Sequence, residues 1–416
     1  MTRRFFYGYR IVAACFAIQM AGGGSLATFG IFFADLQNEF GWSRAAISGA
    51  SSLATLLMGA ASVLFGRLND RIGPRVIMIV SGLALGGGYL LMSRLDALWL
   101  LYVAYGVLVG VGMSTQDVVT LSTVARWFVA RRGMMSGLVK VGTGLGQLVM
   151  PLVAAALILT RGWRGAYVAI GLFVLVVLLL GAQFLRRDPQ GLGLLPLTHR
   201  RPGAPDGTHA AEEESGFSMS AGVRTRQFWL VALAEFTMFF CIMATLVHLV
   251  NHARDLGVAP ATAGVLVSVI GASSIVARFL MGSASDTIGC RKAFTICFAV
   301  LFLGLLWLQV ASSMWMLVLY AVADGFARGG NFVVLSPLTA ELFGTRAHGA
   351  LFGLVTFLGT IGGAVGPLVA GRVFDVTLSY STAFVLLSVL MGLGLAATLL
   401  LRPVGAAAGR QLHNGT

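Results

Sequence analysis

Six ionisable residues stand inside segments of the sequence that are otherwise apolar. They are Asp117, Lys140, Glu235, Arg278, Asp324 and Arg328. An ionised side chain at the depth of a bilayer is costly unless it faces a cavity or a partner, so each is a candidate functional residue. Their formal charges cancel, and structural ion pairs are therefore the simplest alternative explanation.

Two of the acidic residues have a candidate partner. Asp117 and Lys140 lie at similar depth on two segments that share one turn, counted inward at about 1.5 Å per residue. Asp324 and Arg328 are four residues apart, which places them on one face of a helix. Either both are structural pairs, with Lys140 and Arg328 as the basic partners, or Asp117 or Asp324 binds a proton as its pair breaks.

Glu235 and Arg278 have no partner of opposite charge nearby on their own segments. A lone carboxyl in apolar surroundings is destabilised when it is charged, which suits a group that binds and releases a proton. A guanidinium in a cavity can clamp a carboxylate, because its planar donors match two oxygens. The alternative for Arg278 is an arginine at the membrane edge whose charge reaches the lipid headgroups.

The segments that carry these residues are long and apolar. The 416-residue chain is 57% hydrophobic and 11% charged, with a mean hydropathy of +0.87, whereas a soluble domain carries about 25% charged residues. Runs long enough to cross about 30 Å of hydrocarbon predict twelve membrane-spanning helices. We expect them near 9–33, 45–66, 75–93, 97–123, 134–159, 165–185, 227–250, 261–282, 293–311, 314–340, 349–371 and 380–401.

Basic residues predict the orientation in the membrane. The net charge of +13 would suggest a nucleic-acid partner in a soluble protein, but here most basic residues fall in loops on one side of the predicted membrane. The positive-inside rule then places both termini in the cytoplasm, in a multi-pass protein of the cell membrane. Arg161 and Arg164, in the turn after the fifth span, are exceptions. The first span is too long for a signal-peptide core, and we expect it to be retained.

The second half of the sequence repeats the first. Gly66–Arg75 aligns with Gly282–Arg291, with Gly, Asp, Gly and Arg at matched positions, and at the same shift Pro151–Ala154 aligns with Pro367–Ala370. We call two positions related by this shift equivalent. A repeat of half the chain indicates duplication, and two like halves suggest a membrane protein that moves around a site between them.

The predicted parts of the chain follow from this repeat and from a change of composition between the halves. They are an N-terminal six-helix bundle (1–185), a polar cytoplasmic linker (186–226), a C-terminal six-helix bundle (227–402) and a cytoplasmic tail (403–416).

The sequence does not indicate an enzyme. Its four cysteines show neither a disulfide framework nor a metal-ligand spacing, and we find no nucleophile–base arrangement and no nucleotide-binding loop. Gly142–Gly146 superficially resembles a phosphate loop but lacks its Lys-Ser/Thr and lies in a span. We therefore expect no cofactor, no metal and no nucleic-acid partner.

The two repeated loops resemble the signature of the major facilitator superfamily, Gly-x-x-x-Asp-x-x-Gly-x-Arg/Lys. Together with the twelve spans, the resemblance covers essentially the whole chain. It implies an all-α fold of two pseudo-symmetric six-helix bundles that rock around a central site. In that family the signature Asp and Arg close the cytoplasmic side, and by analogy the gate residues are Asp70, Arg71, Arg75, Asp286 and Arg291.

A narrower resemblance is to monocarboxylate transporters and their bacterial relatives, including the oxalate–formate exchangers. It rests on Phe6–Arg10, Trp127-Phe128, Arg131–Gly133 and Ile275–Arg278. The family's substrate arginine corresponds to Arg278.

The chain also departs from that family at two places. Animal relatives carry an aspartate one turn before the substrate arginine, where this chain has Ser274, and a lysine in the first span, which Gly22–Phe33 lacks. Proton coupling would then move to Asp117, Glu235 or Asp324, or the protein would exchange substrates without protons.

We therefore expect a secondary transporter of small organic anions, a proton-coupled symporter of monocarboxylates such as lactate that acts as a monomer in the bilayer. Arg278 would bind the carboxylate, Gln116 and Asn331 would add hydrogen bonds, and Phe332 and Phe357 would supply apolar walls. One alternative is an exchanger of carboxylates or dicarboxylates without proton coupling. Another is a membrane receptor that binds its ligand without moving it.

Overall fold

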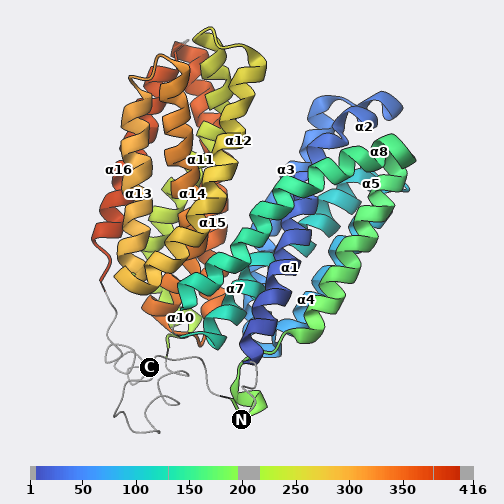
Figure 1. Cartoon of the computed structure of the whole chain (residues 1–416), viewed down its shortest axis with the longest axis vertical. Coiled ribbons are helices and arrows are strands. Elements are labelled where there is room, and N and C mark those ends of the chain that lie inside the picture. Colours follow the sequence, from blue (N-terminus) through green and yellow to red (C-terminus); the bar gives the residue numbers. More distant parts are fainter. Residues whose placement is uncertain (1–5, 130, 195–215, 378, 403–416) are drawn as a thin grey trace. The chain divides into compact units, whose positions relative to one another are not determined.

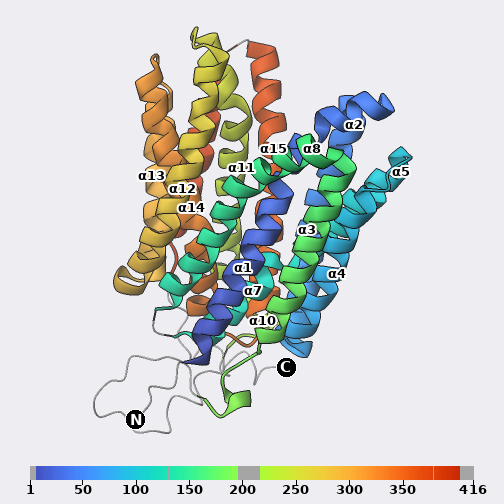
Figure 2. The same ribbon diagram turned by 45° about the vertical axis from the view of Figure 1, so that its right-hand side comes forward.

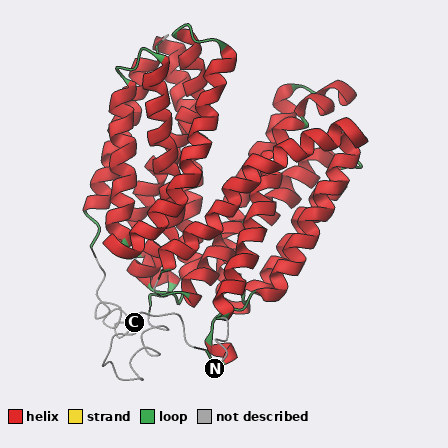
Figure 3. Ribbon diagram, in the orientation of Figure 1, coloured by secondary structure: helices red, strands yellow, loops and turns green. Residues whose placement is uncertain are grey.

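The computed structural model describes residues 6–129, 131–194, 216–377 and 379–402. Residues 195–215 of the predicted linker and the whole of the predicted tail lie outside the described residues. Within the described ranges the chain is helical and forms no strand, apart from one isolated β-bridge between Gly216 and Gly344. Figure 3 shows helices joined by short loops, and the predicted all-α fold is confirmed.

Contacts divide the chain into two compact units. Unit 1 comprises Met1–Asp206 with Ala347–Gly353, and unit 2 comprises Gly207–Arg346 with Leu354–Thr416. Up to residue 194 the helices are α1 (Tyr7–Ala27), η1 (Phe29–Ile31), α2 (Phe33–Phe40), α3 (Arg44–Ile72), α4 (Pro74–Met92), α5 (Leu98–Leu101), the π-helix η2 (Tyr102–Val109), α6 (Gly110–Met113), α7 (Thr115–Trp127), α8 (Arg132–Phe184) and η3 (Gln190–Leu192). From residue 216 they are α10 (Met219–Val223), α11 (Arg226–Asp255), α12 (Pro260–Ile288), α13 (Cys290–Leu308), α14 (Met314–Phe343), α15 (His348–Thr377) and α16 (Tyr380–Leu399).

In the described part of the chain, ten helical segments are long and apolar enough to cross a membrane. One of them, α8, covers both the fifth and the sixth predicted spans and turns at Gly162, whose φ is 69°. The predicted tenth span is α14, which is not among the ten and which contains Asp324 and Arg328. All twelve predicted spans are therefore helical.

The duplication is visible in the backbone. α3 and α12 both have 29 residues, α4 and α13 both have 19, and the helices of each pair begin at equivalent positions. The turn between the two helices is made by Gly73 in unit 1 (φ 97°) and by Gly289 in unit 2 (φ 90°). Residues with side chains rarely adopt such positive φ values, so the repeated glycines preserve the same sharp turn in both halves.

Small residues set how closely helices approach within each unit. In unit 1, α1 packs along α8 (Figures 1 and 2), and a Cβ added at Gly146 would lie 2.1 Å from the carbonyl oxygen of Met20. In unit 2, a Cβ at Gly362 would lie 2.2 Å from the carbonyl oxygen of Phe236. The two residues of the second contact are equivalent to those of the first. Only glycine permits this approach, which brings polar side chains of α1 and α11 within reach of neighbouring helices.

Candidate functional site

Arg278 lies on α12 in unit 2 and is covered by protein. The residue is only 4% exposed, and Ser274, one turn before it, is equally buried. α12 runs close to α14 here: a Cβ added at Gly329 of α14 would lie only 2.2 Å from the carbonyl oxygen of Ser274. An arginine that extends to lipid headgroups would expose its side chain, so this burial favours an internal role.

Glu235 on α11 is bound by Asn331 on α14, which the sequence did not indicate. Neither residue is exposed. Asn331 Nδ2 donates to both carboxyl oxygens of Glu235, at 2.9 Å and 3.1 Å. Gly359 of α15 packs against the same carboxyl side chain, where a Cβ would lie 3.0 Å from Glu235 Cγ. The donor that was expected to serve a substrate therefore holds a buried acid.

Asp324 and Arg328 form the ion pair that their spacing suggests. Arg328 donates to Asp324 Oδ2 from Nη2 at 2.9 Å and from Nε at 3.2 Å. Arg328 Nη2 also donates to the carbonyl oxygen of Ile242 at 2.7 Å, and the Thr245 hydroxyl donates to Asp324 Oδ1 at 3.3 Å. The aspartate and arginine side chains are 0% and 9% exposed. Each charge thus has several partners, which is the arrangement that a buried ion pair needs.

Asp117 and Lys140 also pair, in unit 1. Lys140 Nζ lies 2.7 Å from Asp117 Oδ1, with side-chain exposures of 5% for the lysine and 36% for the aspartate. Gln19 of α1 joins them, since its Nε2 donates to Asp117 Oδ1 and to Thr120 Oγ1, both at 2.8 Å. Its Oε1 accepts from the Thr143 hydroxyl at 2.6 Å. Gln19 therefore ties three helices together around the ion pair.

Sequence reasoning missed Gln19, although the repeat contains a signal for it. Gln19 is equivalent to Glu235, and Thr143, from which it accepts a hydrogen bond, is equivalent to Gly359. The duplicated position thus holds a neutral amide in unit 1 and an acid in unit 2. In each unit it occupies the middle of a buried polar cluster.

The remaining proposed substrate residues are distributed over both units. Gln116 on α7 is 3% exposed, and neither polar atom of its amide has a hydrogen-bond partner within the described residues. Its amide packs on Gly22 of α1, where a Cβ would lie 2.5 Å from Gln116 Cδ. Phe332 is half-buried beside Phe239, with ring centroids 5.5 Å apart, and Phe357 on α15 is also half-buried.

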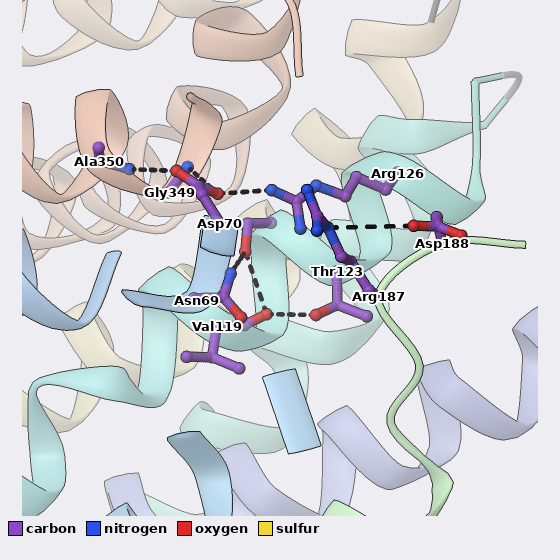
Figure 4. A network of polar contacts seen from close by, with 10 residues as sticks. Asn69, Asp70, Val119, Thr123, Arg126, Arg187, Asp188, Gly349 and Ala350 are labelled. Carbon is purple, nitrogen blue, oxygen red and sulfur yellow. Dashed lines mark hydrogen bonds and ion pairs between the residues drawn. The ribbon is translucent and has the colours of Figure 1, made fainter. Parts of the chain in front are cut away.

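Asp70 is the centre of the network drawn in Figure 4. Its Oδ1 accepts from Arg126 Nη2 at 2.5 Å and from the Gly349 amide at 3.2 Å, and its Oδ2 accepts from the Ala350 amide at 3.0 Å. These amides lie in the first turn of α15, and this turn belongs to unit 1. Amides at a helix amino terminus have no helical partner and favour an anion. Asp70 therefore caps α15 while it neutralises Arg126.

The other predicted gate residues are not among the contacts of Asp70 described above. Arg75 donates to the side-chain oxygen of Gln183, and Arg291 Nη1 donates to the carbonyl oxygen of Leu401 at 2.9 Å. Arg71 and Asp286 are exposed.

Arg126, which binds Asp70, was not predicted as a gate residue. It lies in the last turn of α7, and the equivalent residue in the second half is Leu342. The second half thus lacks an arginine at the place that serves Asp70 in the first.

No group of three or more His, Cys, Asp or Glu residues in the described ranges could hold a metal ion. Each polar cluster described above is instead built around a single acid.

A duplicated set of membrane-length helices with buried charges defines an α-helical membrane protein. The sequence model that describes the Major Facilitator Superfamily matches residues 14–252 and 228–413 of this chain. The chain belongs to that family.

Within the family, the sequence is similar to monocarboxylate transporters. It is 27% identical to monocarboxylate transporter 12 of Rattus norvegicus, over 91% of this chain and 82% of the relative. It is 29% identical to the rat monocarboxylate transporter 13, over 91% and 85%, and 29% identical to the human monocarboxylate transporter 11, over 91% and 80%.

Solved structures of transporters have the same fold as this chain. The fucose:proton symporter of E. coli is 14% identical, with a TM-score of 0.73 over 95% of this chain and 99% of the symporter. A human organic anion transporter is 19% identical, with a TM-score of 0.73 over 94% and 99%. At these identities the likeness shows the fold alone.

Proposed function

We propose that this protein is a secondary transporter of small organic anions and that Arg278 binds the carboxylate group. The observation that carries the proposal is a buried guanidinium on an apolar membrane-spanning helix. Such a charge is costly in a membrane unless it serves a partner or a substrate. The named relatives are monocarboxylate transporters, and the planar donors of arginine match a carboxylate. Monocarboxylates such as lactate are the substrates that we propose.

We further propose that Glu235 couples this movement to protons. Its carboxyl group is fully buried and held by a neutral amide, and no Lys or Arg lies within ion-pair distance of it in the described part of the chain. A negative charge at such a site lacks the compensation that Asp324 receives. Binding a proton removes this cost, and releasing it requires access to water. Glu235 therefore suits a proton carrier better than the paired Asp117 and Asp324.

The test is uptake of labelled lactate into liposomes that contain the purified protein and an inward proton gradient. Losing a charge-assisted contact with a carboxylate costs about 3 kcal/mol, so Arg278→Gln is expected to lower uptake efficiency on the order of 100-fold. Arg254→Gln, which removes an exposed arginine in the same unit, serves as the control. Unchanged uptake by Arg278→Gln would disprove the carboxylate-binding role.

Glu235→Gln tests the coupling separately. Glutamine keeps the shape of the neutral acid and its contact with Asn331, so exchange of lactate across the membrane is expected to persist while accumulation driven by the proton gradient is lost. Accumulation at the wild-type level would show that another group carries the proton.

Proton-independent exchange of carboxylates or dicarboxylates is the second candidate function. It is favoured by Ser274, which stands where animal relatives have an acid, and by the pairing of Asp117 and Asp324 with basic residues. Liposomes preloaded with unlabelled anion and held without a proton gradient distinguish the two modes. Liposomes that contain an exchanger take up label only when they are preloaded with anion. Liposomes that contain a symporter also accumulate label when they are empty, provided that a proton gradient is applied.

A further inference from the structure

A pocket of about 240 Å³ opens in unit 1 where α3 joins α4 and where α8 ends. It is lined by Ile72, Gly73, Pro74, Arg75, Leu185, Arg186 and Arg187. Three of these seven residues carry a guanidinium group and none is acidic. None of its lining residues belongs to the buried clusters around Arg278, Glu235 and Asp117, and the transport proposal does not use its three arginines.

The contacts of these arginines leave their positive charge largely uncompensated. Arg75 donates to the neutral side chain of Gln183. Arg186 Nη1 donates to the carbonyl oxygens of Gln183 and Leu185, both at 3.0 Å. Arg187 has an acidic neighbour, Asp188, but the two approach only to 4.0 Å, and the arginine side chain is 51% exposed. The pocket therefore attracts an anion.

The backbone adds to this attraction. α4 begins at Pro74, so the positive end of its helix dipole meets the same pocket. Gly73 makes the turn there with a φ of 97°, and a Cβ at this position would find only Arg187, at 3.8 Å. A group of phosphate size thus has both side-chain donors and a helix amino terminus beside it, which is a favourable combination for an oxyanion.

An apolar strip begins at the rim of the pocket. Ile72 is 56% exposed, and Val76 and Val80 follow it along α4 with 48% and 45% exposure. On α8, Leu180 and Phe184 are 60% and 47% exposed. The two helices pack against each other (Figure 1), since a Cβ at Gly82 of α4 would lie 3.0 Å from Leu178 of α8. The strip therefore extends along adjacent helices away from the charged end.

We propose that this pocket binds the phosphate headgroup of an anionic phospholipid, with an acyl chain lying along the strip of α4 and α8. A free phosphate would satisfy the arginines but would leave the apolar strip without a role. Clusters of basic residues at the end of membrane helices recognise anionic lipids at about 1 kcal/mol per residue. The basic loops place this end of unit 1 at the cytoplasmic leaflet under the positive-inside rule.

The pocket adjoins the network of Asp70. Figure 4 shows Arg187 and Asp188 next to Arg126, which binds Asp70. A bound phosphate would compete with Asp188 for Arg187 and change the charge beside that network. Because a ligand that binds only the folded state stabilises it, we expect anionic lipid to raise the thermal stability of the protein.

The experiment measures lipids that remain bound to the purified full-length protein by native mass spectrometry. The protein is incubated with equal amounts of phosphatidylglycerol and phosphatidylcholine that have matched acyl chains. The expected result is at least a fivefold preference for phosphatidylglycerol, and its loss in the variant Arg186→Gln/Arg187→Gln. The control Arg224→Gln/Arg226→Gln removes the same charge from exposed positions before and at the start of α11 and should keep the preference.

Three outcomes would overturn the proposal. Equal binding of the two lipids by the wild type would show that the pocket does not select an anionic headgroup. An equal loss of the preference in both double variants would show that only the overall charge of the protein matters. Inorganic phosphate alone, if it stabilises the protein against heat as much as phosphatidylglycerol does and through the same arginines, would identify a site for free anions instead. If the double variant does not fold, Arg187→Gln provides the same comparison at a half-exposed position.

Discussion

The buried pair of Asp324 and Arg328 gives the sharpest quantitative prediction. Replacing Asp324 by Asn keeps the side-chain size but removes the negative charge beside Arg328, whose guanidinium then keeps neutral acceptors such as the carbonyl oxygen of Ile242. Removing one partner of a buried pair costs about 3–5 kcal/mol. If unit 2 unfolds like a soluble domain of its size, about 3 kcal/mol lowers the melting temperature by roughly 6–12 °C.

The double variant Asp324→Leu/Arg328→Met removes both charges and keeps apolar volume. Its stability is expected to lie within about 1 kcal/mol of the wild type, because a buried pair is often replaceable by packed apolar residues. The single variants Asp324→Leu and Arg328→Met, each of which leaves one buried charge without its ionic partner, complete the double-mutant cycle. The interaction energy between the two positions is then expected to be about 2 kcal/mol or more.

Thermal unfolding of the wild type, the two single variants and the double variant in the same detergent, followed by tryptophan fluorescence, measures this cycle. Asp324→Asn is melted alongside them, and lactate uptake is recorded in parallel. A stable Asp324→Asn variant, or effects that simply add, would refute the interpretation of a structural ion pair. Loss of proton-driven uptake in a double variant that is fully stable would assign the proton to Asp324 rather than to Glu235.

Three further predictions concern unit 1. Gly146→Ala should destabilise the protein by about 1–3 kcal/mol because the new Cβ meets the Met20 carbonyl, whereas Gly30→Ala, with open space around it, should be nearly neutral in the same melting assay. Asp70→Asn should increase hydrogen exchange at the α15 amides that it now binds, and unchanged protection there would contradict the capping role. Hydrogen bonds from Arg164 and Trp163 hold the pKa of Glu39 below its usual value, so its contribution to stability is present at neutral pH and is lost as the pH falls through that lowered pKa. The difference in melting temperature between Glu39→Gln and the wild type should accordingly shrink on acidification, and a constant difference would exclude this linkage.

The layout of the chain could be predicted from its sequence. The lengths of its apolar runs predicted the long helices of the described ranges, because crossing a bilayer requires a minimum number of apolar residues. The repeat of the first half in the second predicted paired helices and paired turns, and Gly73 and Gly289 both adopt a positive φ. The spacing of Asp324 and Arg328 along one helix was also sufficient to predict that they form an ion pair, since residues four apart share a face.

The helix that supplies the partner of each remaining group became known only from the folded structure. Asn331 binds Glu235, Arg126 binds Asp70, and Gln19 joins Asp117 to Lys140. Periodicity along a single helix gives the depth and face of a residue but not the helix that lies opposite. That choice depends on how closely the backbones pack, and here close contacts at small residues such as Gly146 bring the polar side chains of separate helices together.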